Sequence, residues 1–255
     1  MSAEPTTDMD GASVVLALLE GYGRNEVSFG ALMRGLTLFD GWKTVADPGG
    51  DDRVLTRLSD VGPWLDLFVT DARLEQHLAQ IPRDVHLSGL TMKGALLAKF
   101  DSGIAGVHIH PGQDRSLILG QDRADLVRMW AETAIVEAML MQRRDLDLTT
   151  LRDWRGWQLL VRTSPAEERA QLVLTADAHG RPVAAVFTAD DCREAFLSRL
   201  PPAMRAGMSV RRMMGAQMFA QLAHMPVHGA AFNPAGPVPS RGYDRVWMER
   251  VVREG

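Results

Sequence analysis

The chain has 255 residues, of which 46% are apolar and 24% are charged, as is typical of a globular protein with enough apolar residues for a core. Its formal net charge of −4 predicts no nucleic-acid partner, because such partners require a basic surface. The longest apolar stretches are far shorter than the roughly 20 residues of a membrane-spanning helix, so no membrane partner is predicted.

The first half of the chain is predicted to mix helices and strands. Helices are expected where apolar residues recur at helical spacing or follow a threonine that can cap them. Strands are expected where apolar runs lie between turn signals. The expected helices lie at 14–22, at 28–38, from Thr70 to Leu78, and from Thr91 through Leu96, Leu97 and Phe100; the expected strands lie at 53–58, 64–70, 107–109 and 116–119.

The second half is predicted to repeat this order after a long, apolar-rich helix over 122–141. A hairpin turn is expected at Asp177-Ala178-His179-Gly180, because aspartate and glycine favour tight turns. The expected strands lie at 171–176, 182–188 and 230–232, and the expected helices begin at Thr188-Ala189-Asp190, near Ser209 and at Ser240.

An internal duplication explains why the two halves look alike. Short motifs recur in the same order at separations of 115 to 123 residues. The matched pairs are Gly41-Trp42 with Gly156-Trp157, Val54–Thr56 with Val173–Thr175, Gly62 with Gly180, Thr70 with Thr188, Gly89 with Gly207, Ala98 with Ala216, Gly106 with Gly229, and Pro111 with Pro234. We therefore predict an α+β protein of two tandem homologous modules, each a mixed sheet packed with helices. The expected parts are a first module at 12–120, a connecting helix at 121–150, a second module at 151–238 and a C-terminal tail helix at 239–255.

These motifs resemble the N-terminal domain of the bacterial SseB family, the enhanced serine sensitivity proteins. The resemblance rests on Asn25-Glu26-x-x-Phe29-x-x-Leu32, Gly41-Trp42, Leu67-Phe68-Val69-Thr70-Asp71 and Gly103-Ile104-x-Gly106-x-x-x-His110-Pro111-Gly112, and in the second copy on Val186-Phe187-Thr188 and Phe232-Asn233-Pro234. The first copy departs from the family at His110, where asparagine is usual. The resemblance implies a cytoplasmic bacterial protein without established catalytic residues, in some bacteria encoded near secretion or regulatory genes.

The sharpest local feature is His108-Ile109-His110, because alternate residues of a strand point to one face and two imidazoles there can share a metal ion. A zinc-type site needs a third converging ligand, and none stands at a spacing that provides one. Histidines His77, His86, His224 and His228 and carboxylates Asp101 and Asp114 are the available candidates. The simpler interpretation is that His110 fills a turn position and bonds to the backbone beside Pro111. We therefore predict no metal site.

The turns at His110-Pro111 and Asn233-Pro234 are matched in the two halves. Each is expected to close a strand, and an asparagine side chain can close such a turn by itself. Since loops at strand ends often carry function, the two turns are also predicted to form a paired binding rim. The binding residues expected there are His108, His110, Pro111, Asn233 and Pro234.

A second candidate surface lies toward the C-terminus, where methionines are frequent. Flexible thioethers suit an adaptable interface, but Met214, Met218 and Leu222 also form a helical stripe, which more often belongs to the core. The neighbouring Arg199, Arg205, Arg211 and Arg212 suit either an acidic partner or a solvated surface. The candidate interface residues are Met213, Met214, Met218, Arg211, Arg212 and Trp247, the last of which docks either on its own module or on another protein.

Motifs for catalysis are missing from the sequence: it has no P-loop, no dinucleotide fingerprint, no nucleophile elbow and no His-Glu-x-x-His. We therefore expect no cofactor and no enzymatic activity. A single cysteine, Cys192, excludes an intramolecular disulfide and fits a reducing compartment. The first ten residues are acidic without a basic residue, unlike a secretory leader, so a cytoplasmic location is predicted.

The sequence thus predicts a non-catalytic protein-binding or regulatory module of the SseB type, accessory to secretion or regulation, with another protein as partner. A monomer is expected, because duplicated modules can mimic a two-fold dimer within one chain. The alternative is a small-molecule or metal binding protein, including an enzyme, that uses the loops around His108, His110 and Asn233.

Overall fold

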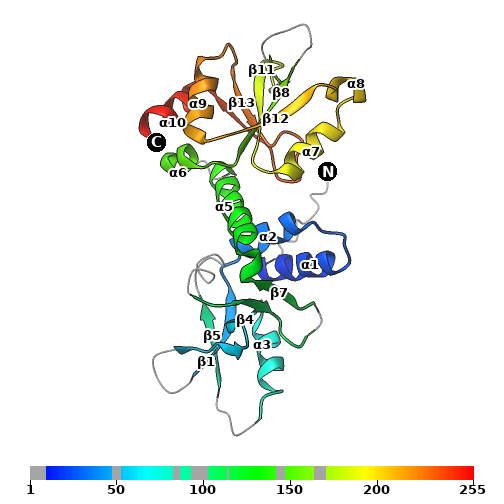
Figure 1. Cartoon of the computed structure of the whole chain (residues 1–255), viewed down its shortest axis with the longest axis vertical. Coiled ribbons are helices and arrows are strands. Elements are labelled where there is room, and N and C mark those ends of the chain that lie inside the picture. The colour runs from blue at the N-terminus through cyan, green and yellow to red at the C-terminus, as the bar shows by residue number, and fades with distance from the viewer. Residues whose placement is uncertain are drawn as a thin grey trace, which may run out of the picture. The chain divides into compact units, whose positions relative to one another are not determined.

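The computed structural model describes residues 10–47, 53–82, 87–92, 103–113, 115–141, 147–163 and 171–255. The chain divides into two compact units, residues 1–134 and 135–255. Each unit holds one mixed sheet with helices packed on it, which confirms the predicted α+β class with two sheet-containing modules (Figure 1). No helix in the described ranges combines the length and apolar character needed to cross a membrane.

The first unit begins with two helices and then forms a sheet whose central path is β2-β1-β4-β6-β7, with β3 added to β4 and β5 added to β1. Its elements are α1 (Gly11–Gly23), α2 (Phe29–Leu38), β1 (Trp42–Asp47), β2 (Arg53–Val54), β3 (Arg57–Ser59), β4 (Gly62–Phe68), α3 (Asp71–Leu78), β5 (Ser88–Met92), β6 (Gly106–Ile109), β7 (Leu117–Gly120), the 3₁₀ turn η1 (Gln121–Arg123) and α5 (Ala124–Met141), which continues into the second unit.

The second unit has the same plan, with a central path β12-β8-β11-β13-β14, β10 added to β11 and β9 added to β8. Its elements are α6 (Leu148–Asp153), β8 (Trp157–Arg162), β9 (Gln171–Leu172), β10 (Leu174–Ala176), β11 (Pro182–Phe187), α7 (Asp190–Ser198), α8 (Pro202–Arg205), β12 (Met208–Met213), α9 (Gly215–His224), β13 (Gly229–Phe232), β14 (Arg241–Asp244) and α10 (Arg245–Glu254).

The two sheets match strand for strand, so the duplication predicted from sequence is visible in the pairing. Among the described strands of each unit one pair is parallel, β4 with β6 and β11 with β13. Leu67 lies opposite Ile109 in the first unit, and Val186 lies opposite Phe232 in the second. This register sets the correspondence between the copies residue by residue.

The register corrects four matches made from sequence: Val54–Thr56 correspond to Leu172–Leu174, Gly62 to Arg181, Thr70 to Ala189 and Gly89 to Val210. Thr188 corresponds to Val69, one residue before Thr70, because Val186 corresponds to Leu67. Thr70 caps α3 by accepting the Arg73 N–H at 3.3 Å, whereas α7 begins after Ala189 without a side-chain cap. Thr188 was therefore wrongly predicted as a helix cap.

Two predicted helix starts are strands in the structure. Thr91 lies in β5, opposite Lys43, and Ser209 lies in β12, opposite Val161. Pairing with β1 and with β8 outweighs the local capping preference of these residues. In the second unit the helix that was expected near Ser209 is α9, which begins at Gly215. The matching helix predicted over Leu96, Leu97 and Phe100 lies outside the described residues.

The C-terminal tail also differs from its prediction. Arg241–Asp244 form β14, which pairs with β13 and extends the second sheet beyond the expected module end at 238. The helix begins only at Arg245, where the side chain of Asp244 accepts the Trp247 N–H at 2.9 Å. A strand of four residues with a central glycine carries too little periodicity to be found from sequence.

The tryptophan of the repeated Gly-Trp motif lies in the hydrophobic core of each unit. Trp42 and Trp157 are fully buried, and each receives an aromatic ring edge-on from three residues earlier, Phe39 at 5.1 Å and Trp154 at 4.8 Å between ring centroids. A Cβ on Gly156 would lie 2.2 Å from the Trp154 ring, so only glycine allows this ring to pack. Packing of an aromatic ring against the buried tryptophan therefore explains the motif in both copies.

Candidate functional site

The predicted binding residues His110 and Asn233 occupy equivalent positions directly after β6 and β13. Both adopt left-handed backbone conformations, with φ of 53° and 50°, which asparagine tolerates better than histidine. Both are buried, with 0% and 2% of their surface exposed. Pro111 and Pro234 are buried as well.

Each of these side chains joins two strands of its sheet. His110 Nε2 accepts the Val69 N–H at 3.1 Å, and Asn233 Oδ1 accepts the Thr188 N–H at 3.0 Å. Asn233 Nδ2 also donates to Thr188 Oγ1 at 2.9 Å. We call this arrangement the latch of each unit. Binding through His110 and Asn233 stays a prediction, to which their burial gives no support.

The latch network of the second unit continues to a buried carboxylate on α5. Thr188 Oγ1 donates to Glu137 Oε1 at 2.5 Å, and Glu137 is 7% exposed. The thiol of Cys192 lies 3.9 Å from the same oxygen. A buried carboxyl group requires such hydrogen-bond partners, because an unpaired polar group in the core is costly. These contacts explain the buried polar groups as parts of the fold.

The protonation state of His110 follows from its hydrogen bond with the Val69 N–H. Since Nε2 accepts a hydrogen bond, the proton of the neutral ring lies on Nδ1, which is buried and has no hydrogen-bond partner in the described part of the chain. Burial, with a smaller contribution from the Arg73 charge, lowers the pKa of His110 to about 4. His110 is therefore neutral at pH 7.

His108 and His110 do not face one site. Strand β6 ends at Ile109, and the left-handed turn sends the His110 ring to the Val69 amide. His108 instead lies on the sheet face, where Nδ1 is 3.0 Å from Arg57 Nη2 and Nε2 is 2.6 Å from Ser116 Oγ. Within the described ranges no three potential metal ligands gather.

The Ser116–His108 contact resembles part of a catalytic triad, but the hydrogen-bond directions differ. Arg57 can only donate, so His108 Nδ1 accepts and the proton of the neutral ring sits on Nε2, pointing to Ser116. Burial lowers the pKa of His108, with Asp66 opposing and the Arg57 charge supporting that shift. In this state His108 cannot take the proton of Ser116, as a general base must.

The methionines of the candidate interface belong largely to the core of the second unit. Met213 and Met218 are buried among Phe219 and Leu222, and Met214 is half-buried. Trp247 packs on its own unit: its ring stacks on Tyr243 at 3.9 Å.

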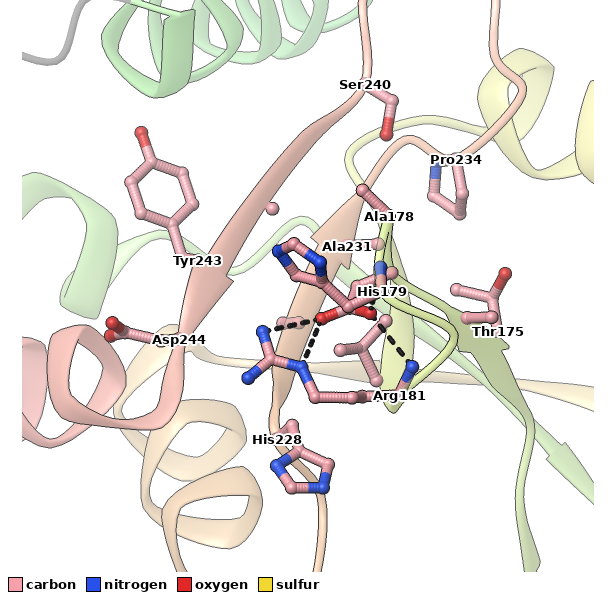
Figure 2. A pocket seen from close by; sticks show the side chains of 15 residues that line it. Thr175, Ala178, His179, Arg181, His228, Ala231, Pro234, Ser240, Tyr243 and Asp244 are labelled. Atoms are coloured by element: carbon pink, nitrogen blue, oxygen red, sulfur yellow. Dashed lines mark hydrogen bonds and ion pairs between the residues drawn. The ribbon is translucent and has the colours of Figure 1, made fainter.

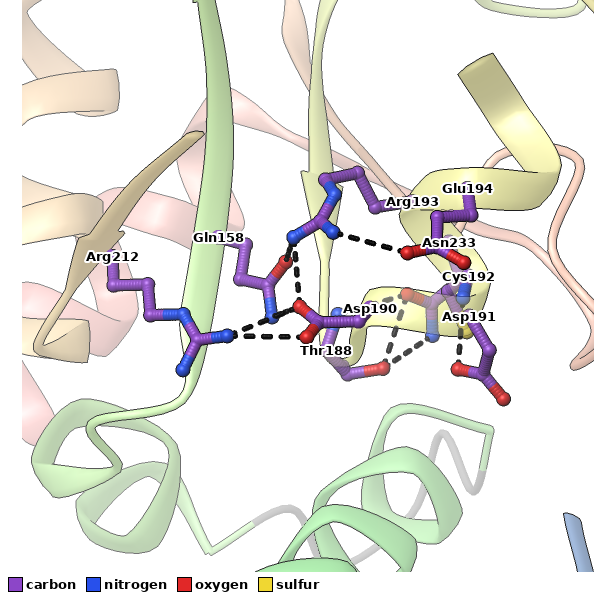
Figure 3. Close-up of polar contacts among 9 residues, drawn as sticks. All are labelled: Gln158, Thr188, Asp190, Asp191, Cys192, Arg193, Glu194, Arg212 and Asn233. Carbon is purple, nitrogen blue, oxygen red and sulfur yellow. Dashed lines mark hydrogen bonds and ion pairs between the residues drawn. The ribbon is translucent and has the colours of Figure 1, made fainter. Parts of the chain in front are cut away.

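Arg211 and Arg212, in contrast, are exposed on β12, the strand that ends the central path of the second sheet. Arg212 lies 3.1 Å from Asp190 Oδ1, which also accepts from Gln158 Nε2 at 2.9 Å and from Arg193 Nη1 at 2.7 Å (Figure 3). Partial burial alone would raise the pKa of Asp190, but the Gln158 bond and the two arginine charges outweigh it and lower the pKa. Arg211 forms no ion pair with any described residue.

A groove on the second unit was not predicted from sequence. It has a volume of about 550 Å³ and crosses β10, β11, β13 and β14 beside the 177–181 turn. The turn is well ordered by Asp177, which accepts the N–H groups of His179 and Arg181, and these bonds, that of Arg181 first, lower the pKa of Asp177 to about 2. Side chains of His179, Arg181 and His228 lie along the groove (Figure 2).

The matching face of the first unit carries longer side chains. Arg57, Asp66, His108 and Ile118 stand there, with Arg57 hydrogen-bonded to both Asp66 and His108. The register places small residues at the same positions of the second unit. They are Thr175 for Arg57, Ala185 for Asp66, Ala231 for His108 and Gly242 for Ile118. Three of these residues, Thr175, Ala231 and Gly242, line the groove, and their short side chains leave space for it.

Comparison with known proteins gives little further information. No family model matches the chain, and no curated protein matches it. Among solved structures, Anabaena Tic22, described as a protein-transport protein, is similar with 10% identity over 78% of this chain and 88% of that chain, at a TM-score of 0.24. A likeness of this degree supports no inference about this chain.

Proposed function

We propose that the chain is a non-catalytic, protein-binding module of the SseB type that acts in the bacterial cytoplasm as an accessory to secretion or regulation, and that the exposed arginines of β12 contact its partner. One observation carries the proposal. Arg211 is exposed on an edge strand, pairs with no described acidic residue, and has no charged counterpart in the first unit.

The duplicated copy shows that the fold does not require Arg211. Met92 lies opposite Trp42 and Met213 lies opposite Trp157, so the positions of Arg211 and Arg212 correspond to Leu90 and Thr91. The first unit forms the same edge strand with those two uncharged residues. A charge that the fold does not need is free to serve recognition.

Arg212 has a structural explanation that Arg211 lacks. In the first unit Lys43 lies 3.2 Å from Asp71, the first residue of α3, and donates to Thr91 at 2.9 Å. In the second unit Gln158 replaces this lysine, and Arg212 on the edge strand supplies the cation to Asp190. The ion pair is kept while the cation moves from one strand to its neighbour.

The surroundings of Arg211 suit a protein partner. Met204 and Val210 are exposed by 48% and 40%, and Arg205 is exposed close by in the sequence. Arginine and methionine are enriched in protein interfaces, where apolar contacts combine with charge pairs. The blocked geometry at Ser116 and His108 supports the non-catalytic part of the proposal.

The test is affinity purification of the tagged full chain from the cytosol of its own organism, followed by mass spectrometry. We expect a stoichiometric partner that is lost from Arg211→Glu. Arg123→Glu is the matched control, because Arg123 is also exposed and forms no ion pair with a described residue. Circular dichroism must show that both variants stay folded. Retention of the partner by folded Arg211→Glu, or no partner at all, would overturn the proposal.

The groove favours a second candidate function, binding of a small molecule by the second unit. Its volume of about 550 Å³ falls in the range typical of ligand pockets, and Pro234 of the predicted binding turn lies in its wall. A ligand present at about 100 times its Kd would stabilise the folded chain by about 2.7 kcal/mol. A metabolite screen of melting temperature, run beside a chain with Ala231→Phe to fill the groove, tests this candidate.

A further inference from the structure

We infer that β12 binds its partner by accepting an acidic, extended segment as an additional strand at the edge of the second sheet. This inference rests on the proposed function and adds to it the conformation and the chemistry of the partner.

The backbone of β12 is suited to strand addition. All of its residues, Met208 to Met213, pair in an unbroken antiparallel register with β8. On its other side β12 pairs with no described strand. Every second residue of such an edge directs its N–H and C=O outward, and these groups can pair with an incoming chain.

The side chains of β12 specify charge on both faces of the added strand. Neighbouring residues of a strand point to opposite faces, so Arg211 and Arg212 stand on different faces and Val210 shares the face of Arg212. Residues directly opposite one another on paired strands interact most strongly. The segment that fits therefore carries an acidic residue opposite Arg211 and an apolar residue opposite Val210, and a second, adjacent acidic residue would share Arg212 with Asp190.

Local charge selects an acidic partner over a basic one. Between residues 190 and 213 the chain has five arginines against two aspartates and one glutamate, a net charge of +2, although the whole chain has a net charge of −4. Arg193 and Arg212 are engaged with Asp190, whereas Arg211 pairs with no acidic residue of the described ranges and can meet an external carboxylate. An approaching acidic segment thus meets a locally positive edge on a negatively charged protein.

A different explanation of Arg211 must be separated from this one. Charged residues on an edge strand also prevent pairing between copies of the same protein. Glutamate at position 211 would serve that protective role as well as arginine does, but it would repel an acidic segment. Arg211→Glu therefore distinguishes recognition from protection.

The experiment uses the full chain and synthetic seven-residue peptides rich in valine and threonine, with fluorescence anisotropy as the readout. One peptide carries a central Asp-Glu pair, and a second carries Lys-Lys in its place. Two more keep the acidic pair but are N-methylated at alternate backbone nitrogens, in the odd or the even positions. N-methylation removes a ladder hydrogen bond without changing charge, and only one of the two sets faces β12.

We expect the acidic peptide to bind, the Lys-Lys peptide to bind at least about tenfold more weakly, and one N-methylated set to lose about tenfold while the other keeps its affinity. Arg211→Glu should lose about tenfold, and Arg123→Glu should bind as the wild type does. Equal affinities of both N-methylated peptides, or no binding of the acidic peptide, overturn strand addition. If the cytosolic partner still depends on Arg211 in that case, the proposed function stands and only the added strand is refuted.

Discussion

Replacing His110 with asparagine should give the first unit the latch that the second unit already has, and should remove a pH-dependent loss of stability. Asparagine offers Oδ1 to the Val69 N–H as Asn233 offers it to the Thr188 N–H at 3.0 Å. It also suits the φ of 53° at this position better than histidine does. At pH 7 we expect the free energy of unfolding to change by less than about 1 kcal/mol, because the better backbone fit offsets the lost imidazole packing.

The magnitude at lower pH follows from the pKa of His110, which burial lowers from 6.5 to about 4 in the folded chain. Because the folded pKa is the lower one, the unfolded chain binds a proton first as pH falls below 6.5, and stability is lost until the pH reaches about 4. At 1.36 kcal/mol for each pKa unit, the loss amounts to about 3 kcal/mol. The full burial of the ring leaves little solvent to screen this effect.

The assay is urea unfolding followed by circular dichroism at pH 7 and near pH 4.5, for the wild type and His110→Asn. We expect the wild type to lose about 2 to 3 kcal/mol more than the variant over this range. His179→Asn, in the exposed 177–181 turn, is the control for removing an imidazole without disturbing a latch. Parallel pH dependence of the wild type and His110→Asn would refute the assigned role of His110.

Three further changes test the packing of the second unit by chemical denaturation. Asn233→Ala should cost about 2 to 4 kcal/mol, because the Thr188 N–H loses its acceptor and alanine is strained at a φ of 50°; a loss below about 0.5 kcal/mol would contradict the latch. Gly156→Ala should cost at least about 2 kcal/mol, since its Cβ would lie 2.2 Å from the Trp154 ring; a neutral effect would show that the ring has room to move. Trp247→Ala should cost about 2 kcal/mol through lost aromatic packing, and unchanged stability would instead leave Trp247 available to a partner.

The duplication and the mixed helices and strands could be predicted because their signals are local or repeated. Gly156-Trp157 repeats Gly41-Trp42 since both copies pack a ring against the tryptophan, and the Asp177–Gly180 turn forms where its residues predict it. The role of His110 as a turn residue was also available from its match with Asn233. These features depend on neighbours in sequence or on comparison of the copies.

The remaining features depend on pairing between distant segments. Thr91 and Ser209 look like helix caps, and only pairing with β1 and β8 makes their segments extended. The groove is made by small residues such as Ala231 and Gly242, which carry no motif, on strands that meet only after folding. Likewise, the bonds of His108 to Arg57 and Ser116 join positions separated by 51 and 8 residues. No periodicity in the sequence records such contacts.

The two copies together indicate where function should be sought. Both keep the latch, which His110 forms in the first unit and Asn233 in the second. Both also keep an ion pair at the first residue of the helix that follows the parallel strand, with the cation on Lys43 in one copy and on Arg212 in the other. Because the residue changes between the copies while the hydrogen bond or ion pair is kept, these positions serve the fold. Arg211 and the groove at Ala231 differ between the copies without a compensating contact elsewhere in the described residues. Since the fold accepts either state at these positions, they are the positions at which the proposed binding functions of the second unit are tested first.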